Sequence, residues 1–359
     1  MTEWKLTYLR ELITIKNGKD HKALHDGEYP VYGSGGIMRY VDKYLYDKES
    51  VLLPRKGTLN NIQYANTPFW TVDTCYYTEV NTEKVLPYFL YNCLRQYDIE
   101  ALNTGSAIPS MTFEKYYSIQ INLPNLETQR RIAEVLSRYD ALIENYQRQI
   151  KLLEEAAQRL YKEWFVDLRF PGHQSTPIIN NLPQGWQKKK LGEIARLKAG
   201  GDKPKVFSSE KTFELTIPVY SNGTINEGLY GFTDTAEINV PCVTISARGS
   251  VGYTVLRRTP FVPIVRLISV IPDDIYEGYL FFYIKDMPLD SNGAAQQQIT
   301  VPMIKDKEII IPENGVLNSF RSQVEPFFIT VDCLKRSIRN LSEARDRLLP
   351  KLMSAEIDV

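Results

Sequence analysis

An internal repeat is the feature that most constrains what this chain can fold into. Residues 4–18, which begin at Trp4, recur as residues 186–200, which begin at Trp186. Four further segments recur in the same order, and their spacing drifts by a few residues, as loop insertions would produce. These pairs are residues 30–37 with 218–225, 56–58 with 248–250, 67–69 with 259–261, and 105–112 with 293–300. The order of the matches indicates a tandem duplication of about half the chain.

Each half ends in a stretch with the apolar spacing of a coiled coil. Apolar residues recur in alternating steps of four and three, which is an average period of about 3.5 residues. Arg345 interrupts the second series, and we expect it to snorkel or to meet a carboxylate. Two unrelated amphipathic helices, each packed on its own domain, are the alternative. The positions expected at the seam are Ile132, Leu136, Tyr139, Ile143, Ile150 and Leu153, and then Val324, Val331, Leu334, Ile338, Leu341 and Leu348.

The remainder of each half has the pattern of mixed, strand-rich structure. Alternating or β-branched runs bounded by Gly, Pro and Asn predict strands. The clearest runs are residues 50–53, 69–72, 242–246 and 264–270. Short helices are expected near residues 86–90 and 279–283.

These patterns predict an α+β fold with two similar globular domains and two long helices. Because only a short linker joins the first helix to the second domain, an antiparallel helix pair with a pseudo-two-fold axis is the economical arrangement. The helices are then expected to form an antiparallel coiled coil that separates the domains. The expected boundaries are domain 1 at residues 1–125, long helix 1 at 126–168, a linker at 169–185, domain 2 at 186–313, and long helix 2 at 314–359.

Composition gives no indication of a nucleic-acid partner by itself. The 43 Lys and Arg residues are balanced by 43 Asp and Glu residues, so any basic surface must be local, as between Lys188 and Lys211. The four cysteines are far apart in sequence, which predicts free, mostly buried thiols in a reducing compartment. The apolar runs are too short for a membrane span, and the first residues carry no apolar signal region. We therefore expect a cytoplasmic protein.

The repeated residues resemble those of a known family across essentially the whole chain. Each half opens with a tryptophan (Trp4, Trp186), continues with a Tyr-x-x-Gly-x-Ile segment, and then has a turn of a basic residue, Gly, and Ser or Thr. Each globular part closes with a strand that ends in proline, at Pro124 and Pro312. In this order the chain resembles the specificity (S) subunits of Type I restriction-modification systems.

The resemblance implies a DNA-binding subunit without catalytic activity. Each half would contain a target recognition domain that reads one part of a split, asymmetric site on double-stranded DNA. The helices, about 50 Å long for 33 residues, would set an unread spacer and dock two modification (methyltransferase) subunits, which restriction (translocase-nuclease) subunits join. S-adenosylmethionine, ATP and magnesium would be bound by those partners, and no cofactor by this chain.

Polar and basic residues at Gly-rich turns are the candidates for DNA contact. Arg and Lys suit guanine O6 and N7, whereas Asn and Gln suit adenine N6 and N7. The turns that recur in both halves are alternatively structural, or grip phosphate rather than read bases. The candidates are Arg55, Lys56, Thr58, Asn60, Asn61, Ser106 and Ser110 in the first half, and Arg248, Ser250, Gln296, Gln297 and Gln298 in the second.

The sequence offers no catalytic or metal-binding constellation. It contains no Asn/Asp-Pro-Pro-Tyr/Phe motif and no P-loop, and the glycines at Gly33, Gly35 and Gly36 lack dinucleotide-binding spacing. His21 and His25 have no third ligand at metal spacing. Two alternatives remain: a specificity subunit that serves a fused methyltransferase-nuclease (Type II-like) system, and a coiled-coil scaffold that does not bind DNA.

Overall fold

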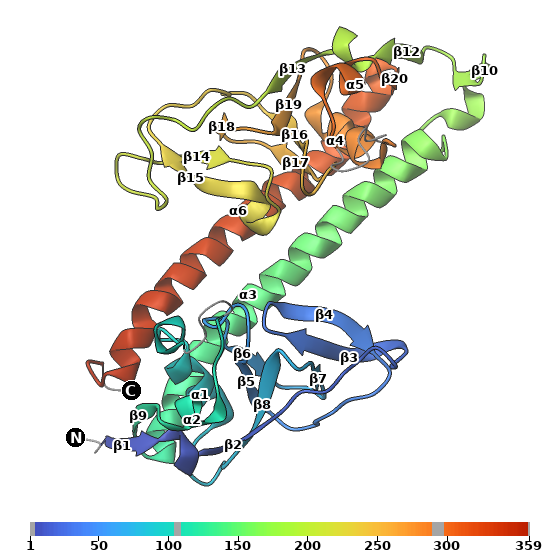
Figure 1. Cartoon of the computed structure of the whole chain (residues 1–359). Helices are drawn as coiled ribbons and strands as arrows, with labels where there is room; N and C mark the ends of the chain where they lie inside the picture. The colour runs from blue at the N-terminus through green and yellow to red at the C-terminus, as the bar shows by residue number, and fades with distance from the viewer. Residues whose placement is uncertain (1–3, 104–108, 289–297, 358–359) are drawn as a thin grey trace. The chain divides into compact units, whose positions relative to one another are not determined.

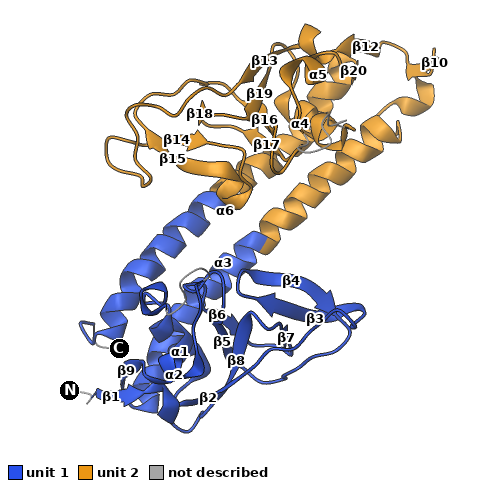
Figure 2. Cartoon of the chain, in the orientation of Figure 1, with its two compact units in different colours: residues 1–147, 335–359 blue, residues 148–334 orange. Residues whose placement is uncertain are grey.

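The computed structural model describes residues 4–103, 109–288 and 298–357 (Figure 1). The candidates Ser106, Gln296 and Gln297 lie outside these ranges. The chain divides into two compact units, coloured separately in Figure 2. Unit 1 comprises residues 1–147 and 335–359, and unit 2 comprises residues 148–334.

Where it is described, unit 1 contains three small sheets. In the first, β1 (Lys5–Tyr8) pairs antiparallel with β9 (Gln120–Leu123). The second has the order β2 (Ile13–Lys16), β8 (Cys75–Val80), β5 (Ser50–Pro54) and β6 (Gln63–Ala65). In the third, β3 (Asp26–Gly33) lies between β4 (Gly36–Val41) and β7 (Trp70–Thr71), and the pairing with β7 is parallel. The helices α1 (Pro87–Leu94) and α2 (Phe113–Tyr117) complete the domain.

Unit 2 contains sheets of the same strand order. The strands β12 (Gln187–Lys190) and β20 (Glu308–Ile311) pair antiparallel, and the four-stranded sheet runs β13 (Ala195–Ala199), β19 (Leu267–Pro272), β16 (Cys242–Ser246) and β17 (Thr254–Arg257). The third sheet places β14 (Ile217–Tyr220) between β15 (Leu229–Thr233) and β18 (Val262–Pro263), again with one parallel pairing. The helices are α4 (Glu277–Asp286) and α5 (Val301–Lys305).

The strands that carry the predicted turns are central and fully buried. All five residues of β5 and all five of β16 are buried, which explains why apolar and β-branched residues predominate in them. In unit 1 two polar side chains of this interior are paired: the Ser50 hydroxyl donates to the Thr78 carbonyl at 2.8 Å, and the Thr78 hydroxyl donates to the Val51 carbonyl at 2.9 Å. In unit 2 the Ser246 hydroxyl of β16 donates to the Asn222 carbonyl at 3.2 Å. Side-chain hydrogen bonds therefore hold each strand from which a predicted turn begins.

The expected run at residues 264–270 is only partly a strand. Strand β19 begins at Leu267, and Arg266 has a φ of 75°, a left-handed conformation that interrupts extended structure. The run at residues 69–72 is likewise shortened to Trp70–Thr71. The two short helices lie where the sequence predicts them, at α1 and α4.

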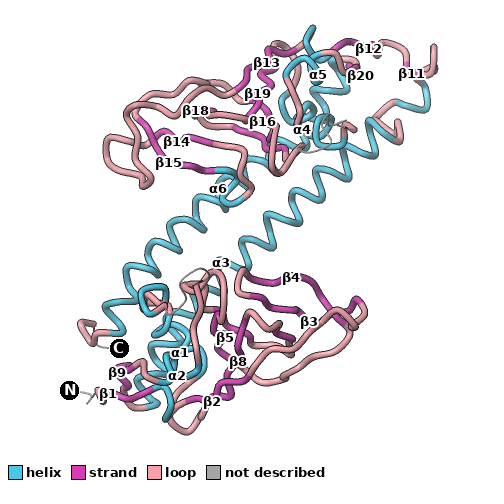
Figure 3. The backbone as a smooth tube through the Cα atoms, viewed as in Figure 1, coloured by secondary structure: helices cyan, strands magenta, loops and turns pink. Residues whose placement is uncertain are grey.

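Two long helices follow the globular parts (Figure 3). The first, α3 (Leu126–Tyr161), begins where the Asn125 side chain accepts a hydrogen bond from the Thr128 amide at 2.9 Å. It continues into a π-helical turn at Lys162–Val166. The second, α6, extends over Asn314–Met353. No helix within the described ranges is long and apolar enough to cross a membrane.

Each unit's core includes residues from both long helices. In unit 1, Ile132 and Leu136 of α3 share a buried cluster with Leu349 and Leu352 of α6. In unit 2, Ala157 and Tyr161 of α3 share a cluster with Phe320 and Val324 of α6, together with Trp186. The compact units therefore divide inside the helices and not at their ends.

The residues expected at the helix seam are all removed from solvent to some degree. Ile132, Leu136, Val324 and Val331 are buried. The others are half-buried: Tyr139, Ile143, Ile150, Leu153, Leu334, Ile338, Leu341 and Leu348. Arg345, which interrupts the series, donates to the Asp140 carboxylate at 2.6 Å, so it does meet an acidic partner.

The segment at residues 169–185, expected as a linker, is partly ordered against unit 2. Phe170 is 4% exposed, and its ring centroid lies 5.1 Å from that of Trp186. A short hairpin joins β10 (Ile178–Ile179) to β11 (Leu182–Pro183). The connection is thus tethered at its beginning and its end.

Candidate nucleic-acid interface

In unit 1 the predicted turn follows the buried strand β5 directly. The Arg55 amide donates to the Thr74 carbonyl at 2.9 Å, and the Gly57 amide donates to the Pro109 carbonyl at 3.2 Å. Gly57 has a φ of 87°, so a side chain at this position would be strained. Lys56, between these anchors, is exposed. The backbone is therefore held on both sides while the lysine side chain projects into solvent.

Unit 2 has the corresponding turn after β16. Gly249 has a φ of 72°, and the Ile299 amide donates to the Ala247 carbonyl at 3.0 Å, as the Met111 amide donates to the Arg55 carbonyl at 2.9 Å in unit 1. The Arg248 guanidinium binds the Gln298 side-chain oxygen through two nitrogens, and the Nε contact is 2.7 Å. Two residues singled out from the sequence, fifty positions apart, thus lie together.

A hairpin tip lies against each of these turns. In unit 1 the Asn61 side chain donates to the Ser34 carbonyl at 2.8 Å, and a Cβ added to Gly57 would lie 3.0 Å from the Ser34 hydroxyl. In unit 2 the Asn222 side chain donates to the Arg248 carbonyl at 2.8 Å. Each hairpin also carries an exposed isoleucine, since Ile37 is 49% exposed and Ile225 is 82% exposed.

These isoleucines were not among the candidates, although the sequence contained the signal. Ile37 and Ile225 both end the Tyr-x-x-Gly-x-Ile segment of the repeat. Isoleucine is usually a buried residue, so its residue type alone predicts a core position. An apolar side chain exposed at equivalent places in both halves is instead available for contact with a partner, such as the methyl group of thymine.

Of the remaining candidates for DNA contact, some have exposed side chains and others form hydrogen bonds within unit 1. Thr58 and Ser250 are exposed, whereas Ser110 is half-buried and its amide donates to the Asn103 side chain at 2.8 Å. Both polar atoms of the Asn60 side chain are occupied: the nitrogen donates to Asp98 at 3.2 Å, and the oxygen accepts from the Glu100 amide at 3.0 Å. Asn60 and Asn61 thus have hydrogen-bond partners within unit 1, and their contact with DNA stays a prediction.

Arg55 is also committed within its own unit. Its guanidinium lies 5.8 Å from the centre of the Tyr76 ring and donates to the Asp73 carbonyl at 3.4 Å. Burial raises the pKa of Tyr76, and the positive charge of Arg55 opposes that shift. Arg55 thus stabilises the turn through contacts within unit 1. The neighbouring Lys56 is exposed to solvent.

Arg257 is a further residue that sequence reasoning missed. Its side chain is 4% exposed, lies 3.6 Å from the centre of the Tyr220 ring, and donates to the Thr244 hydroxyl at 3.2 Å. It also donates to the Glu227 carbonyl. Burial lowers the pKa of Arg257, an effect opposed by Tyr220 and Glu227. Because Glu227 is in the hairpin turn that contains Ile225, Arg257 fastens that turn to the sheet.

The amino-acid sequence that contains these two turns matches the profile of a known protein family. The sequence profile described as "Type I restriction modification DNA specificity domain" matches residues 1–155 and 183–316. The chain belongs to this family.

Relatives within the family are similar over most of their length. A Type I restriction enzyme specificity subunit from Methanocaldococcus jannaschii is 26% identical over 94% of this chain and 86% of its own. Another, from Haemophilus influenzae, is 24% identical over 78% of this chain and 79% of its own.

The fold is also found in a solved specificity subunit. The crystal structure of a Type I restriction-modification S subunit from M. genitalium matches with a TM-score of 0.61, over 98% of this chain and 96% of that one. At 19% sequence identity the likeness concerns the fold alone. Among the described residues of the present family member, no group of three His, Cys, Asp or Glu side chains is arranged to hold a metal ion.

Proposed function

We propose that this chain is the subunit that reads a two-part DNA site in a Type I restriction-modification complex. The observation that carries the proposal is the recurrence of one turn in both units. Each turn follows a buried strand, contains a left-handed glycine (Gly57, Gly249), and lies against a hairpin tip with an exposed isoleucine. Such turns on a rigid sheet are suited to enter a groove of DNA.

The proposal includes a tandem duplication with pseudo-two-fold symmetry. The sequence repeat, the two segments matched by the family profile, and the shared strand orders of the two units support it. Because the two turns differ in sequence, the two half-sites would differ as well. Lys56 would approach phosphate or guanine in one half-site, and the Arg248–Gln298 pair would act in the other.

We further propose that α3 and α6 pair as an antiparallel coiled coil. Within unit 1 the beginning of α3 shares a core with the end of α6, and within unit 2 the end of α3 shares a core with the beginning of α6. The removal of the seam residues from solvent supports the same pairing. In this arrangement the helices would act as a spacer between the half-sites and as the docking surface for partner subunits.

The chemistry would belong to the partners. Two modification subunits would bring S-adenosylmethionine, and restriction subunits would bring ATP and magnesium. The net charge of zero predicts that the isolated chain binds DNA weakly and that a modification subunit strengthens the binding. Equal affinity with and without that subunit would contradict this expectation.

The decisive experiment is to co-express the chain with a modification subunit and to sequence the methylated genomic DNA. We expect a split, asymmetric motif with a fixed unread gap. Exchange of residues 186–313 for the corresponding residues of another family member should change only one half of the motif. A short continuous motif would refute the two-part reading, and the absence of salt-dependent duplex binding would favour the scaffold alternative.

A further inference from the structure

Each unit has a glycine at the tip of a hairpin, at the same place in the repeat. Gly35 lies in the connection from β3 to β4, and Gly223 lies in the connection from β14 to β15. Each is the glycine of the shared Tyr-x-x-Gly-x-Ile segment, and both are exposed. They are distinct from the left-handed glycines of the turns that follow β5 and β16, and the proposed function assigns them no role.

The fold itself does not require glycine at these two positions. Neither residue has a left-handed φ. Apart from atoms of its chain neighbours, a Cβ added to Gly35 would meet no described heavy atom within 4 Å. A Cβ added to Gly223 would make only ordinary contacts, at 3.8 Å from the Gly228 Cα and 4.0 Å from the Ser221 Oγ. Because alanine would fit both positions, the glycine that recurs there points to the close approach of a ligand.

In unit 1 the carbonyl that precedes the glycine is held by a side chain. The Asn61 side chain donates to the Ser34 carbonyl at 2.8 Å. The peptide bond that joins Ser34 to Gly35 is trans, so its N–H points in the direction opposite to its C=O. Because the carbonyl is turned toward Asn61, the Gly35 amide is directed away from it.

Unit 2 orients its glycine in the same way with a different side chain. The Ser246 hydroxyl, which belongs to the buried strand β16, donates to the Asn222 carbonyl at 3.2 Å. The peptide bond from Asn222 to Gly223 is also trans, so the Gly223 amide is directed away from Ser246. Two unrelated hydrogen bonds thus give both hairpin tips an amide that faces away from the strand or turn that holds them.

The two glycine amides lie near basic residues and have no hydrogen-bond partner in the described part of the chain. In unit 1, Ser34 lies against Gly57, since a Cβ added to Gly57 would be 3.0 Å from the Ser34 hydroxyl, and Gly57 directly follows Lys56. In unit 2 the Asn222 side chain donates to the Arg248 carbonyl at 2.8 Å. Each unpaired amide is therefore accompanied by a positive charge on the neighbouring turn.

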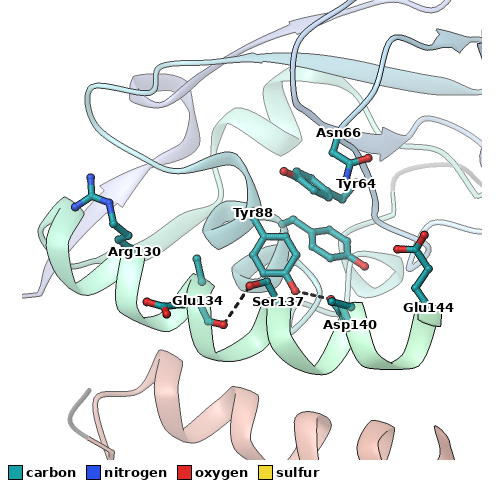
Figure 4. A pocket seen from close by; sticks show the side chains of 11 residues that line it. Tyr64, Asn66, Tyr88, Arg130, Glu134, Ser137, Asp140 and Glu144 are labelled. Atoms are coloured by element: carbon teal, nitrogen blue, oxygen red, sulfur yellow. Dashed lines mark hydrogen bonds between the residues drawn. The ribbon is translucent and has the colours of Figure 1, made fainter. Parts of the chain in front are cut away.

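The hairpin tips differ in this respect from the hollow that unit 1 contains between its globular part and α3. That hollow has a volume of about 660 Å³ (Figure 4). Its acidic side chains already have partners, because Asp140 accepts hydrogen bonds from Tyr88 and Arg345, and Glu134 accepts one from Arg138. The tips instead present donors that remain available to an acceptor from outside.

We propose that the amides of Gly35 and Gly223 each donate a hydrogen bond to a phosphate oxygen of the DNA, one in each half-site. Phosphate oxygens accept hydrogen bonds from exposed backbone N–H groups, and a neighbouring lysine or arginine attracts the same group. A residue without a side chain lets the DNA backbone come within hydrogen-bond distance of the amide. The inference rests on the proposed reading of DNA, and it adds two contacts that fix the register of each unit on the duplex.

The first test replaces each glycine by alanine. The full chain, in complex with a modification subunit, is titrated by fluorescence anisotropy with a duplex that carries the methylated motif. Gly35→Ala and Gly223→Ala should each raise the dissociation constant about tenfold, the scale of one hydrogen bond to a charged group. Their melting temperatures should be unchanged or higher, because alanine restricts the unfolded chain and fits the folded one. A lowered melting temperature would contradict the claim that the fold does not require glycine there.

Gly201→Ala is the matched control. Gly201 is exposed, a Cβ added to it would also meet nothing within 4 Å among the described residues, and it lies in neither hairpin. This variant should bind the duplex like the unaltered chain. If Gly35→Ala and Gly223→Ala bind as tightly as Gly201→Ala, the proposal is wrong.

The second test identifies the phosphate. Duplexes with a single methylphosphonate linkage, in which a methyl group replaces one phosphate oxygen, are compared position by position. For the unaltered chain, one linkage in each half-site should weaken binding, and Gly35→Ala should remove that sensitivity only in the half-site of unit 1. Gly223→Ala should remove it only in the half-site of unit 2, which the exchange of residues 186–313 identifies.

The outcomes separate this inference from the proposed function. If both alanine variants keep the sensitivity of the unaltered chain at every linkage, the amides do not bind phosphate and the inference alone is refuted. If the complex of the unaltered chain binds no duplex, the proposed function is refuted, and the inference falls with it.

Discussion

Replacement of Arg257 by methionine should loosen the hairpin turn of unit 2 at Ile225–Gly228 without affecting unit 1. The guanidinium is 4% exposed, and it holds Glu227, whose φ of 57° is a left-handed conformation. Methionine has a similar volume, so the change removes the charge and its hydrogen bonds while leaving little cavity. The expected result is a local loss of order in residues 221–228.

The magnitude follows from the contacts of Arg257. Hydrogen bonds to a charged group contribute about 1.5–3 kcal/mol. The stacking on Tyr220 is sheltered from solvent and adds about 2 kcal/mol. We therefore expect the free energy of unfolding of unit 2 to fall by about 3–5 kcal/mol. The matched control is Arg196→Met in the same unit, because Arg196 is 74% exposed and its pairing with Asp273, at 3.5 Å, should contribute less than about 1 kcal/mol.

Hydrogen exchange followed by mass spectrometry reports the amide protection of each unit independently within the full chain. Arg257→Met should reduce amide protection in peptides from β14, β15 and β17, whereas peptides from unit 1 should keep theirs. The same variant should weaken only the second half of the methylated motif. If Arg257→Met destabilises no more than Arg196→Met, or if protection falls equally in both units, the account of Arg257 as a fastener of this turn is wrong.

Four further outcomes are expected. Lys56→Ala should reduce the slope of log affinity against log salt concentration by about 0.9 in anisotropy titrations, since one phosphate contact is lost; an unchanged slope would show that Lys56 does not grip phosphate. Ile225→Ala should remove a preference of roughly fourfold for thymine over uracil in its half-site, the value of one methyl group at about 0.8 kcal/mol, and a chain with no such preference would contradict the contact. The hydrogen bond from Arg258 lowers the pKa of Glu325 below 4.5, so its stabilising effect is present at neutral pH and is lost as pH falls through the lowered value; Glu325→Gln should remove this part of the acid dependence in unfolding titrations. A thiol reagent should modify Cys333 rapidly and the three buried cysteines only on unfolding, and rapid labelling of all four would contradict their burial.

The sequence predicted the framework of this protein better than its side-chain contacts. The repeat located both glycine turns, because a left-handed glycine after a buried strand leaves a signature in the residue order. The thiols were also predicted correctly: Cys75, Cys93 and Cys242 are buried and free, and Cys333 is free and exposed. These features depend on local pattern, which a single sequence retains.

Tertiary pairing accounts for most of what was missed. Asn60 has the residue type of a base reader, and its hydrogen bonds to Asp98 and to the Glu100 amide, some forty positions away, leave no signal in the local sequence. Arg257 follows an ordinary strand pattern, and its burial against Tyr220 depends on the neighbouring sheet. The strand expected from Ile264 fails at Arg266 because a left-handed residue there is set by the surrounding fold, not by propensity.

The shared core of unit 1 has a consequence for synthesis of the chain. Its residues Ile132 and Leu136 are buried with Leu349 and Leu352, so the globular part of unit 1, which is translated before unit 2, needs residues 349–352 before its interior is complete. At about 5–20 residues per second, the intervening two hundred residues impose a delay of roughly 10–40 seconds. During that interval unit 2, whose residues form one continuous stretch, can finish folding first. A nascent chain that stalls before Leu349 would therefore hold a folded unit 2 and an incomplete unit 1.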